Sequence, residues 1–437
     1  MASRRVGVIG AGYVGLTSAA CLAHLGHDVV CVEKETSKVD FLAAGVVPIA
    51  EPRLEELVRQ GLANGRLRFT TTRERLASAE VVLLCLPTPM GRDGAADLYA
   101  LESIMPTLAS ILAPGCVLVT KSTVPVGTAG RIAELLRRPD VPVVSNPEFL
   151  REGHAVQDFL SPDRIVVGSA APEAATRVAE LYTGTKAPVL RTGTASAELA
   201  KYASNAFLAM KLSYVNVLAE LCERVGADIT DVSRTMGLDE RIGPLFLVPG
   251  PGWGGSCLPK DTSALLNAAD AAGVDFELLR ATVRANARQQ AMIVRKIRDA
   301  VAGSSAGSLQ GIRIGLLGLT FKAGTDDLRD SPAIAIAEEL AAQGALLTAY
   351  DPRVPATGNR GLPRIHVVDD PYLVAKDAVA VVLLTEWPEF RELDWAQLAA
   401  VTDRAVVIDT RNLLTDETLG GTGFTHIGVG TPISADS

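Results

Sequence analysis

One cysteine of the sequence, Cys257, lies in surroundings that suit a nucleophile. Four glycines occupy the seven positions 249–255, and such a loop would let a ligand press closely against the backbone. A helical pattern follows, with Pro259 in its first turn, where proline is tolerated. A helix N-terminus and the neighbouring Lys260 both favour the thiolate, which is the reactive form of cysteine. We therefore expect a nucleophile at Cys257; the alternative is a structural cysteine buried in a turn.

A nucleophilic thiol beside a hydride acceptor indicates a reaction class. The thiol adds to an aldehyde to give a thiohemiacetal, loss of hydride leaves a thioester, and water then cleaves the thioester. Asp261 lies four residues after Cys257 and could share its helix face. Lys201 and Asn205 have the same spacing, so a cation and an amide donor could together stabilise an oxyanion. From spacing alone, a solvated helix face explains Lys201 and Asn205 better.

A Gly-x-Gly-x-x-Gly motif, formed by Gly10, Gly12 and Gly15, follows an apolar strand pattern and opens a helical one. The first glycine permits a tight turn, the second lets the backbone approach a pyrophosphate, and the third allows close helix–strand packing. Glu33 ends the next strand pattern, where an acid would bond the ribose hydroxyls of NAD and repel the 2′-phosphate of NADP. The combination predicts an NAD site; the alternatives are FAD and a glycine turn without a ligand.

These residues belong to alternating strand and helix patterns, which indicate parallel sheets wrapped by helices. The expected strands are residues 6–9, 28–32, 81–86, 117–121, 141–145 and 164–168, then 313–317, 346–350, 378–384 and 405–409. In both sets the second strand ends in an acid, Glu33 and Asp351. A helical pattern without proline or glycine fills residues 196–225, roughly 45 Å of helix at 1.5 Å per residue. Such a helix would bridge domains or form a subunit contact, and more helical sequence runs over residues 263–301.

The predicted fold is therefore α/β, with two Rossmann-like domains of parallel sheets joined by a long central helix and a helical segment. A polar, glycine-containing linker at 304–311 precedes the second domain. We expect an N-terminal NAD-binding domain at 1–195, a central helical linker and dimerisation domain at 196–303, and a C-terminal nucleotide-sugar domain at 304–437.

The composition of the chain restricts its class. A length of 437 residues suits two or three domains, and a net charge of -8 argues against a general nucleic-acid binder. No apolar run is long enough to span a bilayer, and the N-terminal glycines belong to the dinucleotide motif rather than to a signal peptide. The six cysteines form no Cys-x-x-Cys pair or Cys/His cluster, which predicts a reducing compartment and no metal site. We expect a cytoplasmic protein with no nucleic-acid or membrane partner.

Further motifs accompany these residues in order along the chain. They are Pro87-Thr88-Pro89, STVPVG at 122–127, NPEFLREG at 146–153, Lys201 with Asn205, GGSCLPKD at 254–261, Phe321-Lys322 with DLRDSP at 327–332, and DTRN at 409–412. Together with the glycine motif, the series resembles the UDP-glucose/GDP-mannose dehydrogenase family over almost the whole chain. The resemblance implies a homodimer built on the long central helix. It also implies oxidation of the C6 alcohol of UDP-glucose to the carboxylate of UDP-glucuronate, with two NAD.

The resemblance also implies roles for individual residues. Cys257 is the nucleophile, Lys201 and Asn205 stabilise the oxyanion, and Asp261, Glu148 and Thr123 handle water and protons. The implied cofactor contacts are Gly10, Gly12, Tyr13, Val14, Gly15, Glu33, Lys38, Thr88, Thr123, Glu148, Lys260 and Arg329. The implied nucleotide-sugar contacts are Glu148, Phe149, Leu150, Arg151, Lys201, Asn205, Arg241, Phe246, Gly254, Cys257, Lys322 and Arg411, with Arg241 acting across the dimer.

Two rival functions stay open. Leu258 stands where this family often has Phe and where GDP-mannose enzymes often have Leu, so GDP-mannose is the alternative substrate. Against it, residues 158–168 resemble the UDP-glucose branch, and UDP-N-acetylmannosamine enzymes usually have His at the position of Cys257. A non-catalytic NAD-binding scaffold or sensor is the other rival, which the fold alone could not exclude. It would not need all the candidate catalytic side chains together.

Overall fold

The computed structural model of the chain describes residues 3–91, 94–303, 307–357 and 361–431, and it divides into two units. The first unit comprises Met1–Ser204 and Ser263–Val274, and the second comprises Asn205–Thr262 and Asp275–Ser437. Helices α9 (Thr194–Val225) and α11 (Leu258–Ala271) contribute residues to both units. Part of the linker predicted at 304–311, residues 304–306, lies outside the described residues.

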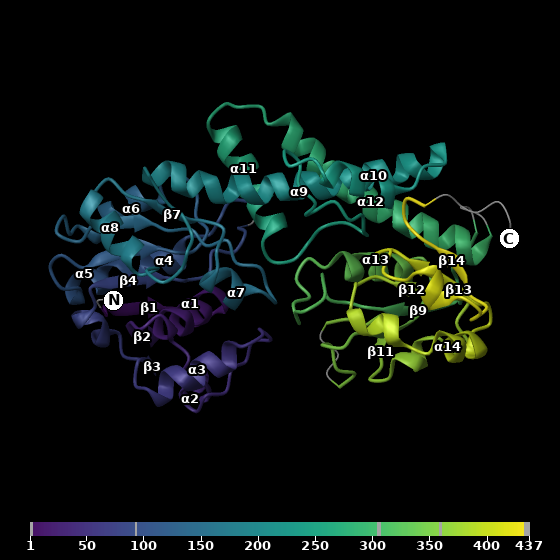
Figure 1. Cartoon of the computed structure of the whole chain (residues 1–437), viewed down its shortest axis with the longest axis horizontal. Coiled ribbons are helices and arrows are strands. Elements are labelled where there is room, and N and C mark those ends of the chain that lie inside the picture. Colours follow the sequence, from purple (N-terminus) through teal and green to yellow (C-terminus); the bar gives the residue numbers. More distant parts are fainter. Residues whose placement is uncertain (1–2, 92–93, 304–306, 358–360, 432–437) are drawn as a thin grey trace. The chain divides into compact units, whose positions relative to one another are not determined.

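An eight-stranded sheet in the order β3-β2-β1-β4-β5-β6-β7-β8 forms the centre of the first unit (Figure 1). Its strands are β1 (Arg5–Ile9), β2 (Asp28–Val32), β3 (Leu67–Thr70), β4 (Val81–Leu84), β5 (Val117–Thr120), β6 (Val143–Ser145), β7 (Ile165–Gly168) and β8 (Val189–Thr192). The strand order reverses beside β1, as in a Rossmann fold. Neighbouring strands are parallel except β6 and β7, where Ser145 lies opposite Gly168 in an antiparallel register that the sequence did not predict.

Helices cover both faces of this sheet. One apolar core packs α1, α3, α7 and α8 against the strands, and another packs α4, α5 and α6 against the opposite face. The helices are α1 (Tyr13–His24), α2 (Thr36–Ala43), α3 (Leu54–Ala63), α4 (Tyr99–Ser103), α5 (Met105–Ile111), α6 (Thr128–Leu136), α7 (Ala155–Leu160) and α8 (Pro172–Glu180). Helix α1 can lie close to the strands because it buries small side chains, including Ala19, Ala20 and Cys21.

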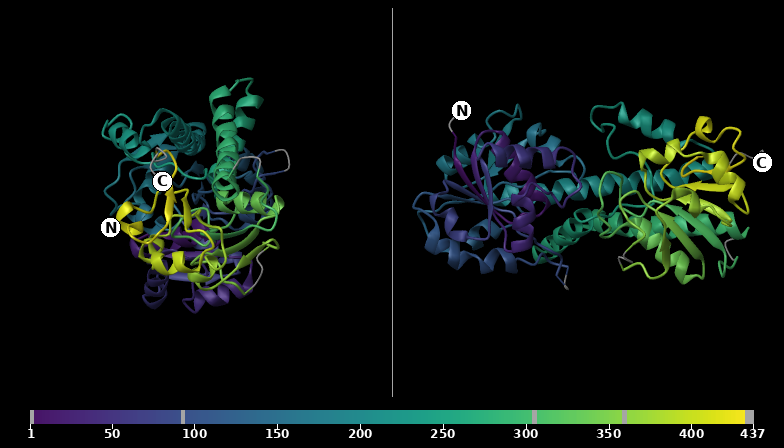
Figure 2. Two further views of the ribbon diagram at one scale, coloured as in Figure 1. Left: turned by 90° about the vertical axis from the view of Figure 1, so that its right-hand side faces the viewer. Right: turned by 90° about the horizontal axis from the view of Figure 1, so that it is seen from below.

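The second unit contains a six-stranded sheet in the order β11-β10-β9-β12-β13-β14, in which all neighbouring strands are parallel. Its strands are β9 (Arg313–Leu317), β10 (Leu346–Tyr350), β11 (Ile365–Val367), β12 (Ala380–Leu383), β13 (Val406–Asp409) and β14 (Thr425–Ile427). Figure 2 shows these strands side by side, coloured green to yellow. The predicted α/β class with two Rossmann-like sheets is therefore confirmed.

One face of the second sheet packs against α12 (Glu277–Ala302), α13 (Pro332–Ala342) and the second-unit part of α9. The other face packs against α14 (Trp395–Val401) and two 3₁₀ helices, Pro371–Val374 and Pro388–Glu392. Helices α10 (Ile229–Gly237) and α15 (Asp416–Leu419) also belong to the unit.

The long helix predicted at 196–225 is confirmed as α9, which has 32 residues. The helical sequence at 263–301 is instead divided between α11 and α12. Gly273 ends α11 in a left-handed conformation, with φ +70, while the Val274 N–H donates to the Ala269 carbonyl at 2.9 Å. This is a glycine-terminated helix end. In the described part of the chain, no helix combines the length and the apolarity needed to cross a membrane.

Candidate active site

The turn between β1 and α1 has the shape that the glycine motif predicts. Gly10 has a φ of +94, and a Cβ there would lie 2.5 Å from the Cys85 carbonyl oxygen. A Cβ on Gly15 would lie 1.9 Å from the Gly10 carbonyl oxygen, so only glycine lets α1 approach β1 this closely. At Gly12, the N-cap of α1, nothing lies within 4 Å of the Cβ position. The open backbone at this helix N-terminus fits the pyrophosphate of a dinucleotide.

Glu33 lies beside this turn, directly after β2. Its Oε2 accepts a hydrogen bond from the Ala11 N–H at 3.0 Å, its Oε1 accepts one from the Lys34 N–H at 2.7 Å, and Lys38 Nζ is 3.7 Å from Oε2. Burial raises the pKa of the Glu33 carboxyl, but these N–H groups and the Lys38 charge outweigh burial and hold the pKa below its ordinary value. The group is therefore a carboxylate at neutral pH, as recognition of ribose hydroxyls requires.

Three further predicted residues follow the carboxyl ends of neighbouring strands. Thr88 comes after β4, Thr123 after β5 and Glu148 after β6, and the Thr88 hydroxyl donates to the Thr123 carbonyl at 2.9 Å. Since carboxyl ends of parallel strands lie at one edge of a sheet, the first unit gathers these side chains at the same edge as the glycine turn. Tyr13 and Val14 form the first turn of α1 at that edge.

Glu148 and Lys201 form a buried ion pair. Lys201 Nζ lies 3.0 Å from Glu148 Oε1, while the Leu150 N–H donates to Glu148 Oε2 at 2.6 Å. The Lys201 ammonium also lies 5.3 Å from the centre of the Phe149 ring, within reach of a cation–π interaction. Lys201 and Asn205 are 3% and 8% exposed. The solvated helix face that their spacing favoured is therefore wrong for both.

In the second unit, Asp261 is the centre of a second polar cluster. Asn205 Nδ2 donates to Asp261 Oδ2 at 2.6 Å, and Lys260 Nζ donates to Asp261 Oδ1 at 2.6 Å. The Asp261 side chain is 1% exposed, so both hydrogen bonds form away from water. Asp261 also donates its N–H to the Cys257 carbonyl at 2.9 Å, which places the two residues one helical turn apart. The predicted position of Cys257 just before a helix N-terminus is confirmed, since α11 begins at Leu258.

Cys257 differs from the other five cysteines of the chain. It is exposed, whereas Cys21, Cys31, Cys85, Cys116 and Cys222 are buried. Burial raises the pKa of the Cys85 and Cys116 thiols to about 12, so they remain protonated at neutral pH. The exposed thiol at the start of α11 is thus the cysteine that a substrate can reach.

The glycine-rich loop before Cys257 packs against protein atoms. A Cβ on Gly254 would lie 1.9 Å from the Asp330 carbonyl oxygen, and one on Gly255 would lie 2.7 Å from the Phe321 ring. At Gly252, with a φ of +122, it would lie 2.9 Å from Asn286 Oδ1. The sequence suggested that these glycines let a ligand press closely against the backbone; at these three Cβ positions, residues of the second unit itself lie in close contact. The glycines fix the loop and so fix the start of α11.

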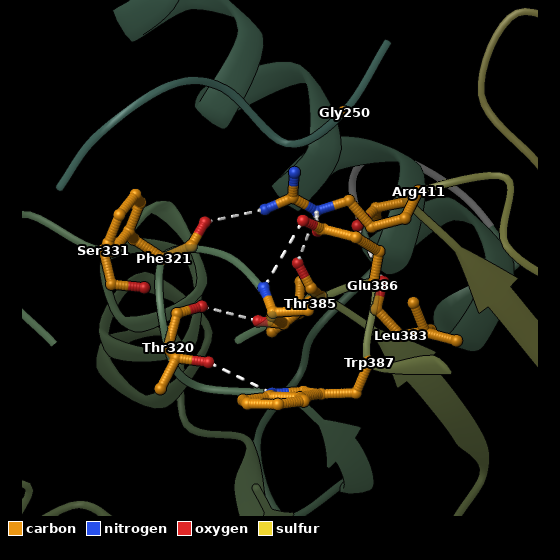
Figure 3. A network of polar contacts seen from close by, with 12 residues as sticks. Gly250, Thr320, Phe321, Ser331, Leu383, Thr385, Glu386, Trp387 and Arg411 are labelled. Carbon is orange, nitrogen blue, oxygen red and sulfur yellow. Dashed lines mark hydrogen bonds and ion pairs between the residues drawn. The ribbon is translucent and has the colours of Figure 1, made fainter. Parts of the chain in front are cut away.

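Arg411, which follows β13, is held at the carboxyl edge of the second sheet (Figure 3). Its Nε donates to the Leu384 carbonyl at 2.9 Å, and its guanidinium also donates to the Phe321 carbonyl at 3.1 Å. The Glu386 carboxylate lies 3.1 Å from Nε, and this contact is electrostatic because the Nε hydrogen is donated to Leu384. Lys322 lies beside Phe321, with its ammonium 5.6 Å from the ring centre. Two predicted substrate residues, Arg411 and Lys322, are thus brought near one backbone segment.

Other predicted arginines are paired with acids close by in the sequence. The ion pairs are Arg151 with Asp158 at 2.6 Å, Arg241 with Asp239 at 2.5 Å, and Arg329 with Asp327 at 2.6 Å. A ligand phosphate would have to compete with these carboxylates. Phe246 lies in the loop after α10 with a φ of +62. Within the described ranges, no group of three or more His, Cys, Asp or Glu side chains is arranged to hold a metal ion.

Glu51 and Asp351 are two of the buried carboxylates that were not assigned a role from the sequence. Glu51 contacts both Tyr13 and the Gly153 N–H, and its only sequence signal is its place between Pro48 and Pro52. Asp351, at the end of β10, takes the place in the second sheet that Glu33 takes in the first. Its Oδ2 accepts hydrogen bonds from the N–H groups of Leu319 at 2.7 Å and Thr320 at 2.9 Å, and from Trp387 Nε1 at 3.2 Å.

Comparisons with known proteins agree with the motifs. Three domain models of the UDP-glucose/GDP-mannose dehydrogenase family match: the NAD binding domain at residues 4–186, the central domain at 195–288 and the UDP binding domain at 315–416. A UDP-glucose 6-dehydrogenase from Rhizobium meliloti (strain 1021) is 43% identical, over 98% of this chain and 100% of the relative.

Solved structures give the same picture. A UDP-glucose dehydrogenase from Pyrobaculum islandicum has a TM-score of 0.86 and 34% identity, covering 97% of this chain and 98% of that one. A UDP-D-ManNAc dehydrogenase from Pyrococcus horikoshii has a TM-score of 0.87 and 29% identity, covering 98% and 99%.

Proposed function

This chain belongs to the UDP-glucose/GDP-mannose dehydrogenase family, and from that premise we propose that it oxidises UDP-glucose to UDP-glucuronate through a thioester on Cys257. It is an NAD-dependent oxidoreductase. The fold does not select the substrate, because the UDP-glucose and UDP-D-ManNAc enzymes have nearly equal TM-scores. Sequence identity favours UDP-glucose, at 43% over the full length of the Rhizobium meliloti enzyme.

The observation that carries the mechanism is the exposed Cys257 one helical turn before the buried carboxylate of Asp261. When bound, NAD would supply the hydride acceptor, and each of the two oxidations would consume one NAD. In the first step the C6 alcohol becomes an aldehyde, and its hydroxyl proton passes to water near Asp261. The Cys257 thiolate then adds to the aldehyde carbon, which forms a C–S bond and leaves negative charge on oxygen.

Lys201 and Asn205, on successive turns of α9, are the proposed donors to that oxygen. Loss of the second hydride from the tetrahedral carbon leaves the thioester. Water, deprotonated with the help of Asp261, Glu148 and Thr123, attacks the thioester carbon, and the C–S bond breaks. The carboxylate product leaves, and Cys257 returns to the thiolate.

We further propose a division of labour along the chain: NAD binding by residues 1–195, a helical linker and dimer contact at 196–303, and nucleotide-sugar binding by 304–437. The order of the matched domain models supports it. In this proposal Thr88, Lys38, Lys260 and Arg329 contact NAD. The nucleotide sugar is contacted by residues 148–151, Arg241, Phe246, Gly254, Lys322 and Arg411.

An apolar stripe on α9 supports a homodimer. Its members recur at helical spacing and are 45–65% exposed: Phe207, Tyr214, Val217, Leu221 and Val225. A single-sided stripe of this kind is suited to burial against a second copy of the helix. The Arg241 side chain, 88% exposed, would then act across the dimer. We also propose a cytoplasmic location, because all six cysteines are free, as in a reducing compartment.

A direct assay tests the function. The purified protein is incubated with NAD and either UDP-glucose or GDP-mannose, and NADH is followed by its absorbance. We expect turnover with UDP-glucose and two NADH for each sugar consumed. Turnover with GDP-mannose but not with UDP-glucose would identify GDP-mannose as the substrate. Binding of NAD without turnover of either sugar would favour a non-catalytic scaffold.

A further inference from the structure

Glu51 is a buried carboxylate to which the catalytic scheme above assigns no role. It lies in the loop before α3, and its side chain is 8% exposed. Its Oε2 accepts a hydrogen bond from the Gly153 N–H at 2.9 Å, and its Oε1 accepts one from the Val156 N–H at 3.3 Å. The Tyr13 hydroxyl also donates to Oε2. Both carboxylate oxygens are therefore engaged in hydrogen bonds within the first unit.

The partners of Glu51 come from two parts of the proposed site. Tyr13 directly follows Gly12, the open glycine of the cofactor turn, and begins α1. Gly153 is the last residue of the segment 146–153. This segment also contains Glu148, which accepts a hydrogen bond from the Leu150 N–H. The Tyr13 hydroxyl accepts a second hydrogen bond from the Gly153 N–H at 2.9 Å. Tyr13 and Glu51 thus share one N–H at the end of this segment.

The direction of the hydrogen bond between Tyr13 and Glu51 is fixed. Burial raises the pKa of the Tyr13 phenol far above its usual range, and the hydrogen bond to Glu51 and the Glu51 charge raise it further. The phenol therefore keeps its proton and points it at the carboxylate. Removing either side chain would take this hydrogen bond from the other, while the hydrogen bond that each accepts from the Gly153 N–H would remain.

Glu51 also takes the place of a missing helix cap. The N-cap residue of α7, His154, makes no side-chain capping hydrogen bond, whereas Glu51 accepts from the N–H of Val156 in the first turn of α7. A carboxylate at this end also interacts favourably with the helix dipole. Gly153 and α7 are therefore held by a residue that is itself held by the cofactor turn.

We propose that Glu51 is a positioning residue, and that the Tyr13–Glu51–Gly153 contact couples binding of NAD to binding of the nucleotide sugar. A pyrophosphate bound at Gly12 would contact the first turn of α1. It would thereby affect the position of the Tyr13 hydroxyl, because Tyr13 begins that turn. That hydroxyl and Glu51 share the Gly153 N–H, so a change at Tyr13 alters how the 146–153 segment is held. Coupling of this kind is reciprocal, so each ligand tightens binding of the other by the same factor. The inference rests on the proposed function, because it takes the 146–153 segment to contact the sugar nucleotide.

The test measures the coupling directly. Isothermal titration calorimetry gives the Kd of UDP-glucose with and without saturating NADH, a pair of ligands that cannot react with each other. For the unaltered protein we expect NADH to tighten UDP-glucose binding by at least about 5-fold. In Tyr13→Phe and in Glu51→Gln we expect this ratio to fall close to one and the KM for UDP-glucose to rise. The double variant should bind UDP-glucose no more weakly than Glu51→Gln does, because the two side chains act as a unit.

Tyr372→Phe is the matched control. The Tyr372 hydroxyl also accepts a backbone hydrogen bond, from the Asp394 N–H at 3.0 Å, but it lies in the second unit and outside the proposed site. This variant should keep the coupling of the unaltered protein.

Three results would overturn the inference: a coupling ratio near one in the unaltered protein, an unchanged ratio in Tyr13→Phe, or lower thermal stability of the variants with both KM values unchanged. The last would assign Glu51 a structural role only. If Glu51→Gln does not fold, Tyr13→Phe still tests whether the contact couples the two ligands, because this variant leaves Glu51 bound to both backbone N–H groups. Failure of the proposed function is visible separately, as absence of UDP-glucose oxidation by the unaltered protein.

Discussion

Lys201 Nζ lies 3.0 Å from Glu148 Oε1, and these two side chains are only 4% and 7% exposed. Breaking a buried ion pair by removing one partner typically costs about 3–5 kcal/mol, because the other charge stays buried without compensation. Lys201 therefore has a structural role in addition to the proposed one at the oxyanion. The two roles can be separated by experiment.

We expect Lys201→Ala to lower kcat by at least roughly 100-fold, the scale of losing one oxyanion donor, and also to lower the Tm. Adding Glu148→Gln should restore much of the lost stability, because it removes the unpaired charge, but it should not restore kcat. Steady-state kinetics and thermal unfolding of the single and double variants measure the two effects. Near-normal turnover of Lys201→Ala would leave the residue with a structural role only.

Cys257→Ser should lose nearly all steady-state turnover while still binding NAD and UDP-glucose. The serine hydroxyl ionises far less readily than a thiol, and an ester, if formed, hydrolyses more slowly than a thioester. Intact mass spectrometry would then detect a trapped sugar adduct. A thiol alkylator should add one label to the folded protein and none to the variant, because the other cysteines are buried. Full two-step turnover by Cys257→Ser would rule out the covalent mechanism.

Glu33→Ser should narrow the preference for NAD over NADP. The carboxylate beside the proposed cofactor turn would repel a 2′-phosphate by charge, and serine would remove that repulsion. The ratio of kcat/KM for the two cofactors measures the preference. Glu35→Ser is a control from the same loop, because Glu35 instead accepts a hydrogen bond from Ser37. Equal use of both cofactors by the unaltered protein would contradict the assignment.

The stabilising effect of Glu33 should depend on pH. Its pKa is lowered in the folded protein from an ordinary value of 4.5, so the folded state binds this proton more weakly than the unfolded chain does. The contribution to stability is thus present above pH 4.5 and is lost as the pH falls through the folded-state pKa. In urea unfolding, the difference between the unaltered protein and Glu33→Gln should shrink over that range. A difference that is constant with pH would contradict the lowered pKa.

Leu221→Lys should dissociate the proposed homodimer. The substitution puts a charge in the middle of the apolar stripe on α9, where a partner helix would have to bury it. Analytical ultracentrifugation at several concentrations gives the association state. Leu373→Lys serves as the control, since Leu373 is 47% exposed and lies outside the stripe. An unaltered protein that is monomeric at all concentrations would remove the basis of this prediction.

The strands that the sequence failed to indicate share one position in the fold. All four, β3, β8, β11 and β14, are edge strands of their sheets. Edge strands are covered less completely, and β8 and β14 contain no fully buried residue. They therefore lack the continuous apolar run that identifies a central strand of a parallel sheet, such as β4 or β12, in which every residue is buried.

The site was predictable where one short segment determines its own geometry. The glycine turn and the start of α11 at Cys257 are of this kind, because glycine conformation and helix capping are local properties. Contacts between distant segments were not predictable. The spacing of Lys201 and Asn205 cannot reveal that Glu148 and Asp261 cover them, nor can the sequence around Glu51 reveal its contacts with Tyr13 and Gly153.

In the second sheet an acid, Asp351, follows β10, just as Glu33 follows β2 in the first sheet. The hydrogen bonds of Asp351 have a consequence for the kinetics of the reaction. Asp351 is 3% exposed, its Oδ2 accepts hydrogen bonds from Leu319, Thr320 and Trp387, and its Oδ1 accepts one from the Arg353 N–H at 2.9 Å. It is therefore less accessible to an adenosine ribose than Glu33, which is only partly buried. In the proposed mechanism, the two oxidations of one sugar would then share the dinucleotide site of the first unit. The half-oxidised sugar would have to stay bound while spent cofactor departs and fresh cofactor arrives, and the catalytic cycle would contain a cofactor-exchange step in its middle.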